Sequence, residues 1–217
     1  LPYTVSPATL SFFGLLIAWY LRGRSRLRAI GAAPHPARQF SFWLGLLLCY
    51  LVLHTRFDYF SQYMFFMHRI QHLVLHHVGA FLIALANPLP VFEAGAPRRI
   101  GRDHPLVRVL RPPALVLQHP LVAAVLFVGI IFFWLIPEVH FEAMLSHNRY
   151  MLMNWSMFID GVLFWLLILD PRRPGQTAHM PRHGTRFAMI WATAFPQIIL
   201  GAWITLSRSN IYDVYSV

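Results

Sequence analysis

Residues 64–77 read MFFMHRIQHLVLHH, and the stretch continues as an apolar run to Ala86. Its composition is that of a membrane helix, yet it carries four histidines and one arginine. Ionisable groups at bilayer depth are costly, and they usually face the interior of a helix bundle or a polar cavity. The stretch therefore predicts a transmembrane helix that turns a polar stripe toward other helices.

The histidines of this stretch are spaced to lie on one helix face. His68, His72 and His76 follow one another at intervals of four residues, so each is rotated only about 40° from the last. Met64 continues the stripe toward the helix start. Imidazole and thioether together suit copper, whereas imidazole alone suits haem or zinc. Three other interpretations stay open: the histidines could hydrogen-bond neighbouring helices, line a water-filled pocket or transfer protons.

The composition of the whole chain excludes an ordinary soluble domain. Of its 217 residues, 57 % are hydrophobic and only 12 % are charged, with a net charge of +10. In a soluble protein such a charge would suggest nucleic acid as a partner. Here the arginines lie in connections between apolar runs, so we expect no nucleic-acid partner. We predict an all-α fold, a polytopic transmembrane helix bundle that forms a single domain over residues 1–217.

Six apolar runs predict six membrane spans. Their approximate ranges are 6–22, 39–55, 62–87, 114–136, 147–169 and 187–206. Ser6-Pro7 is a helix start signal, and Asn87-Pro88 is a stop signal. We expect loops at residues 22–39 and 88–114, the second with room for a short surface helix, and a short connection at residues 138–147.

The arginines are distributed asymmetrically among these connections. Those after the first, third and fifth spans hold 14 of the 18 arginines, namely Arg22, Arg24, Arg26, Arg28, Arg38, Arg98, Arg99, Arg102, Arg108, Arg111, Arg172, Arg173, Arg182 and Arg186. Arginine-rich loops stay on the cytoplasmic side. We therefore predict a multi-pass protein of the bacterial inner (cytoplasmic) membrane with its N-terminus outside, and an even number of spans places the C-terminus there too.

In this orientation two histidine-bearing helices open to the outer leaflet. On the fifth span, His147, Met151 and Asn154 lie on one face within about 60°. We predict that this face meets His68 and His72, and that the metal ligands are His68, His72, His147 and Met151. Imidazole with a soft thioether favours copper as Cu(I).

Four further residues are accessory candidates: His76, Asn154, Met64 and Asp160. Asp160 lies near mid-membrane and is turned about 120–140° from the histidine face of its own span. We expect it to pair with His76 or His77. His54 and His140, at the outer ends of the second and fourth spans, are expected to be hydrated interfacial side chains.

Several short motifs, taken in order, make the chain similar to a known family. They are Tyr3…Ser6-Pro7, Arg38…Phe42-Trp43-Leu44-Gly45, His68-x-x-Gln71-His72, Asn87-Pro88, Trp134-x-x-Pro137, His147 and Gly161-x-x-Phe164-Trp165. The chain resembles the CtaG-type cytochrome c oxidase assembly proteins, a bacterial multi-span membrane family. The resemblance implies a non-enzymatic role in maturing haem-copper oxidases by handling copper for the catalytic subunit. The implied partners are oxidase subunits and membrane lipid, and a homo-oligomer stays open.

The chain departs from that family at several places. Ile136 or Pro137, and Asn154, stand where the family often has histidines, and six spans replace the seven usual there. Asparagine is a poor ligand for Cu(I). Two alternatives therefore stay open: an electron carrier that holds haem b between His147 and a histidine of the third span, and a metal-free structural subunit. The pattern His72-x-x-x-His76-His77 also resembles a di-iron oxygenase box, but one isolated short motif is weak support.

Overall fold

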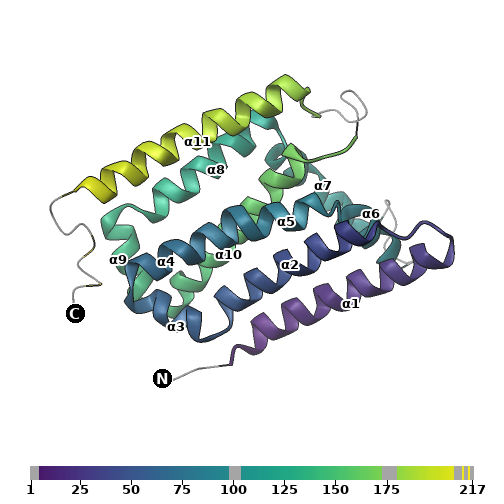
Figure 1. Ribbon diagram of the computed structural model, residues 1–217, viewed down its shortest axis with the longest axis horizontal. Helices are drawn as coiled ribbons and strands as arrows, with labels where there is room; N and C mark the ends of the chain where they lie inside the picture. The colour runs from purple at the N-terminus through teal and green to yellow at the C-terminus, as the bar shows by residue number, and fades with distance from the viewer. Residues whose placement is uncertain (1–4, 98–103, 173–179, 208–211, 213–214, 216–217) are drawn as a thin grey trace.

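The computed structural model describes residues 5–97, 104–172, 180–207, 212 and 215, and helices make up its regular structure (Figure 1). In chain order the elements are α1 (Pro7–Ala29), α2 (Pro36–Leu53), α3 (Arg56–Tyr63), α4 (Phe65–His72), the π-helical segment η1 (Leu73–Val78), α5 (Gly79–Leu85), α6 (Leu89–Gly95), α7 (Pro105–Leu117), α8 (Pro120–Trp134), α9 (Pro137–Leu145), α10 (His147–Ile168) and α11 (His183–Leu206). The predicted all-α class is confirmed.

The first helix is longer than the sequence predicts. The Ser6 side chain caps it, and a proline follows at its first position, as expected. The helix then continues through the arginines to Ala29, because arginine is a good helix former. The Arg26 guanidinium donates to the carbonyls of Ala94 and Ala96, at 2.7 and 2.9 Å. Much of the predicted loop at residues 22–39 is therefore helical and joins α1 to the end of α6.

The histidine stretch is not the single regular helix predicted over residues 62–87. Met64 has extended backbone angles (φ −128°, ψ 111°) and separates α3 from α4. The six residues of η1 then interrupt the α-helical hydrogen bonding. The predicted stop is confirmed, since α5 ends before Asn87, which adopts a positive φ of 49°. The polar stripe therefore begins after a break and changes register partway along.

Two sharp bends add helices where the sequence predicts connections. The axis of α6 is bent by 69° from the α4–α5 segment, and that of α9 by 72° from α8. The predicted short connection at residues 138–147 is thus largely the helix α9. The surface helix allowed for residues 88–114 is present as α7, which ends at Leu117, before α8 begins.

The described helices support a membrane protein without confirming six spans. Three helices, α2, α10 and α11, are long and apolar enough to cross a membrane, and there are five such spans if each bent pair counts as one. The helix α1 does not join them, because its second half carries Arg22, Arg24, Arg26 and Arg28. The first predicted span therefore stays a prediction.

The helix α10 lies at the centre of the packing. It contacts α5 and η1 on one side and α8 and α9 on the other. The helix α2 packs on α5 and η1, while α11 packs mainly on α8. Gly161 of α10 permits the closest approach, because a Cβ atom there would lie 2.5 Å from the backbone oxygen of His76. The histidine segment and α10 are therefore held at nearly backbone-to-backbone distance.

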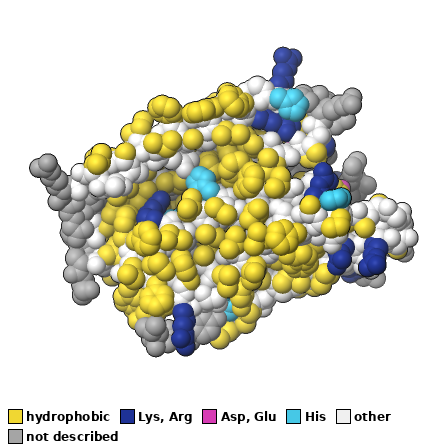
Figure 2. Space-filling model, viewed as in Figure 1, with side chains coloured by type: hydrophobic (Ala, Val, Ile, Leu, Met, Phe, Trp, Pro, Cys, Tyr) yellow, Lys and Arg dark blue, Asp and Glu magenta, His cyan; other side chains and the backbone are white. Residues whose placement is uncertain are grey.

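Both ends of the bundle have a distinct character. The helices α3 and α9 lie beside the start of α1 and the end of α11, whereas α6 and α7 lie at the opposite end (Figure 1). Most of the basic side chains visible in Figure 2 gather at that opposite end, near the end of α1 and the start of α11. The fold thus brings the arginine-rich connections together, as the predicted orientation requires.

Candidate functional site

The side chains of His68 and His72 form the centre of the candidate site. The helix α4 places them one turn apart, and their rings lie with centroids 4.2 Å apart. His68 is fully buried and His72 is 2 % exposed. None of their four ring nitrogens meets the geometry of a hydrogen bond, although the Ser61 backbone lies close to His68 and the Asn154 amide lies close to His72. Buried polar atoms almost always have a partner, so two adjacent imidazoles without one require an explanation.

A third histidine, His140, completes this cluster and was missed by sequence analysis. Its ring centroid lies 5.1 Å from that of His68, and the side chain is fully buried in α9. Nδ1 lies 3.0 Å from the Trp134 carbonyl oxygen, and Nε2 lies 2.9 Å from the Tyr215 hydroxyl. The expectation of a hydrated interfacial His140 is therefore wrong. The available signal was Pro137-Glu138, which starts helices as readily as it ends them.

Two tyrosines near the C-terminus, Tyr212 and Tyr215, pack against the cluster. Tyr212 stacks on Phe65 with ring centroids 4.6 Å apart, and its hydroxyl donates to the Leu135 carbonyl oxygen at 2.9 Å. The Tyr215 ring lies 5.7 Å from that of His140. The tail was predicted only as a short polar end, yet these two tyrosines help to bury the histidines.

On α10, Tyr150 and Asn154 face the histidine pair. They are four residues apart, and Met157 and Gly161 continue the same stripe. Tyr150 lies 6.1 Å from His68 between ring centroids. The Asn154 amide is buried beside His72 and Tyr150, but neither of its polar atoms completes a hydrogen bond. Asn154 thus lies where its accessory role was predicted.

The structure places His147 and Met151 in a different pocket. They line an open cavity of about 210 Å³ together with His54, Asp58 and other residues at the α3 end of the bundle. His147, the first residue of α10, is exposed, and Met151 is partly buried. Successive helix residues are rotated by about 100°, so the face that carries Tyr150 cannot also carry Met151. The predicted four ligands are therefore divided between an inner pair and an outer pair.

Two polar side chains separate the inner pair from the outer pocket. The Gln71 amide nitrogen donates to the Val52 carbonyl oxygen at 2.8 Å and to Asp58 Oδ1 at 2.9 Å. The Tyr150 hydroxyl donates to Asp58 Oδ1 at 2.8 Å and lies 3.0 Å from Gln71 Oε1. The carboxyl group of Asp58 thus lines the outer pocket, and the side chains of Gln71 and Tyr150 hold it there through hydrogen bonds.

Asp58 gives this network a titratable group outside the membrane-spanning segments. Burial raises the pKa of its carboxyl above the ordinary value, while hydrogen bonds from Tyr150, Gln71 and Gln62 partly offset that rise. A carboxyl whose pKa is raised by folding contributes stability at low pH that is lost as pH rises through the folded value. The folded protein should therefore lose stability as Asp58 ionises.

We expect the substitution Tyr150→Phe to enlarge the loss of folding stability that accompanies ionisation of Asp58. Removing a hydroxyl that donates to the carboxylate raises the pKa of Asp58 further and costs about 1–3 kcal/mol for the unsatisfied group. Thermal unfolding in detergent, followed over about pH 4 to 8, should show a larger decrease that continues to higher pH. In proteins that also carry Asp58→Asn, the stability of the forms with and without Tyr150→Phe should change with pH in the same way, because the titrating carboxyl is absent from both. Identical pH profiles of Tyr150→Phe and wild type would contradict the role of Asp58.

The other accessory candidates are divided between a buried pair and the surface. Asp160 Oδ2 lies 3.0 Å from His76 Nε2, which confirms the expected pairing of Asp160. His76 also stacks on Phe127 with centroids 4.0 Å apart. Met64 is 52 % exposed at the break before α4 and does not extend the buried stripe.

The lone His54 also differs from its expected hydrated state. It is 4 % exposed, Nε2 accepts the Ser6 backbone N–H at 2.9 Å, and Nδ1 lies 3.1 Å from the Tyr50 hydroxyl. His54 thus ties the start of α1 to the end of α2. Although it lines the outer pocket, both ring nitrogens are engaged in that link.

The described residues do not form a metal centre of the usual ligand number. Among the residues that the structure describes, no group of three or more His, Cys, Asp or Glu side chains is arranged to hold one metal ion. The inner pair can instead offer two neutral imidazoles, and the outer pair one imidazole and one thioether. Both sets are soft or intermediate donors of the kind that copper prefers.

Comparisons with known proteins give one match. Residues 18–217 match the family described as cytochrome c oxidase caa3 assembly factor (Caa3_CtaG). No curated protein and no solved structure matches the chain. The match covers every helix described above except the first half of α1.

Proposed function

The chain belongs to the family of cytochrome c oxidase caa3 assembly factors, and we propose that it carries copper to the catalytic subunit of that oxidase. The family role confirms the predicted link to oxidase assembly and implies association with the oxidase itself. An assembly role needs binding and release rather than bond chemistry, so we assign no catalytic residue. The proposal concerns what is bound, where it is bound and how it leaves.

The observation that carries the proposal is the inner pair of His68 and His72. Two buried imidazoles lie ring to ring, and none of their four nitrogens meets the geometry of a hydrogen bond. Leaving such groups unsatisfied costs about 1–3 kcal/mol each. A bound metal ion would recover this cost for one nitrogen of each ring, because a neutral imidazole binds a metal through its unprotonated nitrogen. His68 and His72 are therefore the residues we expect to hold the ion.

Two protein ligands suit a copper ion that is carried and released better than one that stays bound as a cofactor. A structural metal site usually has four protein ligands, and a catalytic one has three. Two imidazoles hold Cu(I) more weakly than a thiolate cluster would, which favours release to a partner. Transfer then requires only exchange of ligands. The copper keeps its oxidation state, and no proton has to be taken up by a neutral imidazole.

The outer pocket supplies a natural entry for the ion. His147 is exposed there, Met151 is beside it, and the Asp58 carboxyl lines the same cavity. A cation arriving from water would meet a soft thioether, an imidazole and an acid. The Gln71–Tyr150 contact lies between this pocket and the inner pair. We propose that the outer pair acquires copper and that the inner pair holds it for delivery within the membrane.

Haem has less support from the geometry. Axial ligands approach haem iron from opposite sides of the macrocycle. The rings of His68 and His72, with centroids 4.2 Å apart, leave no room for a macrocycle between them. His147 lines the outer pocket with Asp58 and does not complete an opposed pair with His68. We therefore favour copper and derive no step through haem.

Metal analysis of the purified protein tests the proposal directly. Protein isolated from cells grown with ordinary copper, in a buffer without added metal, should retain about one copper ion per chain, the number that one inner pair would hold. The absorption spectrum should show no Soret band. A Soret band with stoichiometric iron would support the haem alternative, and protein free of every metal even after copper loading would support a structural subunit.

The predicted orientation determines which side supplies the copper, and cysteine labelling can test it. Cys49 is fully buried, so a new surface cysteine should dominate the reaction. Arg28→Cys lies at the arginine-rich end and should react in intact cells only with a membrane-permeant maleimide. Gln62→Cys, at the α3 end, should react with an impermeant one. The reverse pattern would place the outer pocket in the cytoplasm.

A further inference from the structure

A second cavity lies between α11 and the segment formed by α4 and η1. Its volume is about 360 Å³. Its walls are mainly apolar and come from α4, α8, α10 and α11, including Phe65, Ile131, Leu135, Met157, Leu200 and Ile204. Leu73, which also lines the cavity, is 51 % exposed. The surface between α11 and the α4–α5 segment is mostly hydrophobic, with basic and histidine side chains set into it (Figure 2). The cavity therefore opens toward the face expected to meet lipid.

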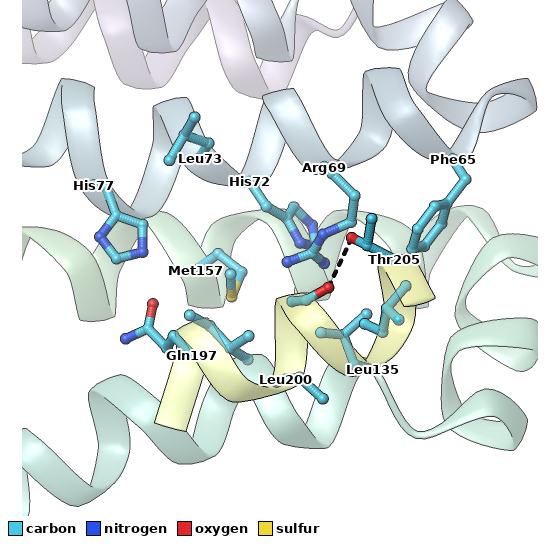
Figure 3. Close-up of a pocket in the computed structure, with 13 residues that line it drawn as sticks. Phe65, Arg69, His72, Leu73, His77, Leu135, Met157, Gln197, Leu200 and Thr205 are labelled. Atoms are coloured by element: carbon cyan, nitrogen blue, oxygen red, sulfur yellow. Dashed lines mark hydrogen bonds between the residues drawn. The ribbon is translucent and has the colours of Figure 1, made fainter. Parts of the chain in front are cut away.

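One charged side chain projects into this apolar cavity. Arg69 enters it from α4, next to His72, while Gln197 and Thr205 line the facing wall formed by α11 (Figure 3). Arg69 makes no hydrogen bond or ion pair with any residue that the structure describes, although the side chains of Tyr212 and Tyr215 lie near enough to interact with it electrostatically. The amide nitrogen of Gln197 is also buried without an acceptor. The cavity thus presents hydrogen-bond donors with nothing to receive them.

Among the residues that the structure describes, the acids Asp58 and Asp160 are already engaged with other partners. Asp58 accepts from Gln71 and Tyr150, and Asp160 pairs with His76. A guanidinium at membrane depth without a counter-charge is costly, so such residues are almost always paired. The described part of the chain does not supply that pair. A ligand with a negative charge would.

We propose that this cavity binds an anionic amphiphile, a membrane molecule with a carboxylate or phosphate head and an apolar tail. The planar guanidinium of Arg69 matches two oxygens of such a head, and the Gln197 amide offers a further donor. Arg69 lies about one turn from the start of α4, close to the membrane surface expected there. The tail would lie along the apolar walls toward Leu200. This cavity adjoins the proposed copper site, because His72 lines it, but the proposal does not depend on copper carriage.

Native mass spectrometry of the full-length protein in an uncharged detergent tests the proposal. The probes are phosphatidylglycerol, palmitate, phosphatidylcholine and inorganic phosphate. Wild type should retain phosphatidylglycerol or palmitate at one copy per chain, and whichever binds more tightly identifies the source of the head. Phosphatidylcholine should bind at least about tenfold more weakly, because its head is neutral overall, and inorganic phosphate should not displace the amphiphile.

Two pairs of variants assign this binding to the cavity. Arg69→Gln should weaken retention at least about tenfold, whereas Arg149→Gln, an exposed arginine paired with Glu142, should not. Gly201→Leu should fill the cavity without a backbone clash, because a Cβ atom there meets nothing within 4 Å. Gly129→Leu is the matched control, since its Cβ is equally free and it does not line the cavity.

The outcomes separate this proposal from copper carriage. None of the four variants changes His68 or His72, so copper content should stay at the wild-type level in all of them, while amphiphile retention should fall only in Arg69→Gln and Gly201→Leu. If Arg69→Gln does not fold, Gly201→Leu tests the proposal in its place. Arg69→Lys keeps the positive charge and should bind the amphiphile more tightly than Arg69→Gln does. Equal retention by wild type, Arg69→Gln and Gly201→Leu, or equal binding of phosphatidylcholine and phosphatidylglycerol, would overturn the proposal.

Discussion

Replacing His72 with alanine should remove most of the bound copper, lowering affinity by at least about tenfold. Substitutions that only support a metal ligand typically cost 10–100-fold in affinity, about the range to expect as a minimum for a ligand itself. His72 is one of only two imidazoles in the inner pair, so its loss leaves a single ligand. Copper per chain, measured by mass spectrometry after purification, should fall accordingly. Activity of the partner oxidase in cells should fall with it, while its subunits still insert.

Two further variants show whether a loss of copper comes from the missing imidazole of His72. His72→Gln preserves much of the side-chain volume, yet an amide is a poor ligand for Cu(I), so it should lose copper as well. His183→Ala removes an exposed histidine at the start of α11 and should retain copper and oxidase activity. Full copper occupancy and full oxidase activity in both His72 variants would show that the histidine stripe only supplies polarity for helix packing.

Replacing Gly161 with alanine should destabilise the bundle by about 1–3 kcal/mol. A Cβ atom there would lie 2.5 Å from the backbone oxygen of His76 and 2.8 Å from its Cα. Backbone atoms cannot rotate away as a flexible side chain could, so α10 and η1 would have to separate. That movement would stretch the bond between His76 and Asp160, which joins the same two elements. The melting temperature in detergent should fall.

The matched control for this change is Gly129→Ala in α8. No atom lies within 4 Å of a Cβ built at Gly129, and alanine favours a helix over glycine by about 1 kcal/mol. This variant should be as stable as wild type or slightly more stable. If Gly161→Ala were equally harmless, the close approach of α10 to the histidine segment would not be a determinant of stability.

Local patterns in the sequence were sufficient for the fold class and for much of the site. The apolar runs predict the helices, and the four-residue spacing correctly places His68 and His72 together and inward. The Asn87-Pro88 stop and the pairing of Asp160 with His76 are likewise confirmed. These results depend on helix periodicity and on the cost of burying polar groups in an apolar setting, both of which act within one or two turns.

Tertiary structure alone decided which stripes meet. The sequence predicted that the face of α10 with His147, Met151 and Asn154 meets the histidines. Asn154 does lie there, but Tyr150 stands beside it in place of His147 and Met151. Adjacent helix residues differ by about 100°, so a small rotation of one helix exchanges one face for the next. No local pattern reports that rotation, because it depends on how α10 packs against η1, α8 and α9 at once.

The π-helical turn and the contacts of His140, Tyr212 and Tyr215 with the site were equally impossible to predict from the sequence. Within η1 the hydrogen bonds run from residue i to i+5, so the histidines after His72 shift in register. His140, Tyr212 and Tyr215 reach the site from segments far along the chain. Periodicity determines which residues share a helix face. Contacts between distant segments determine what that face meets, because their free energy depends on every helix packed around them.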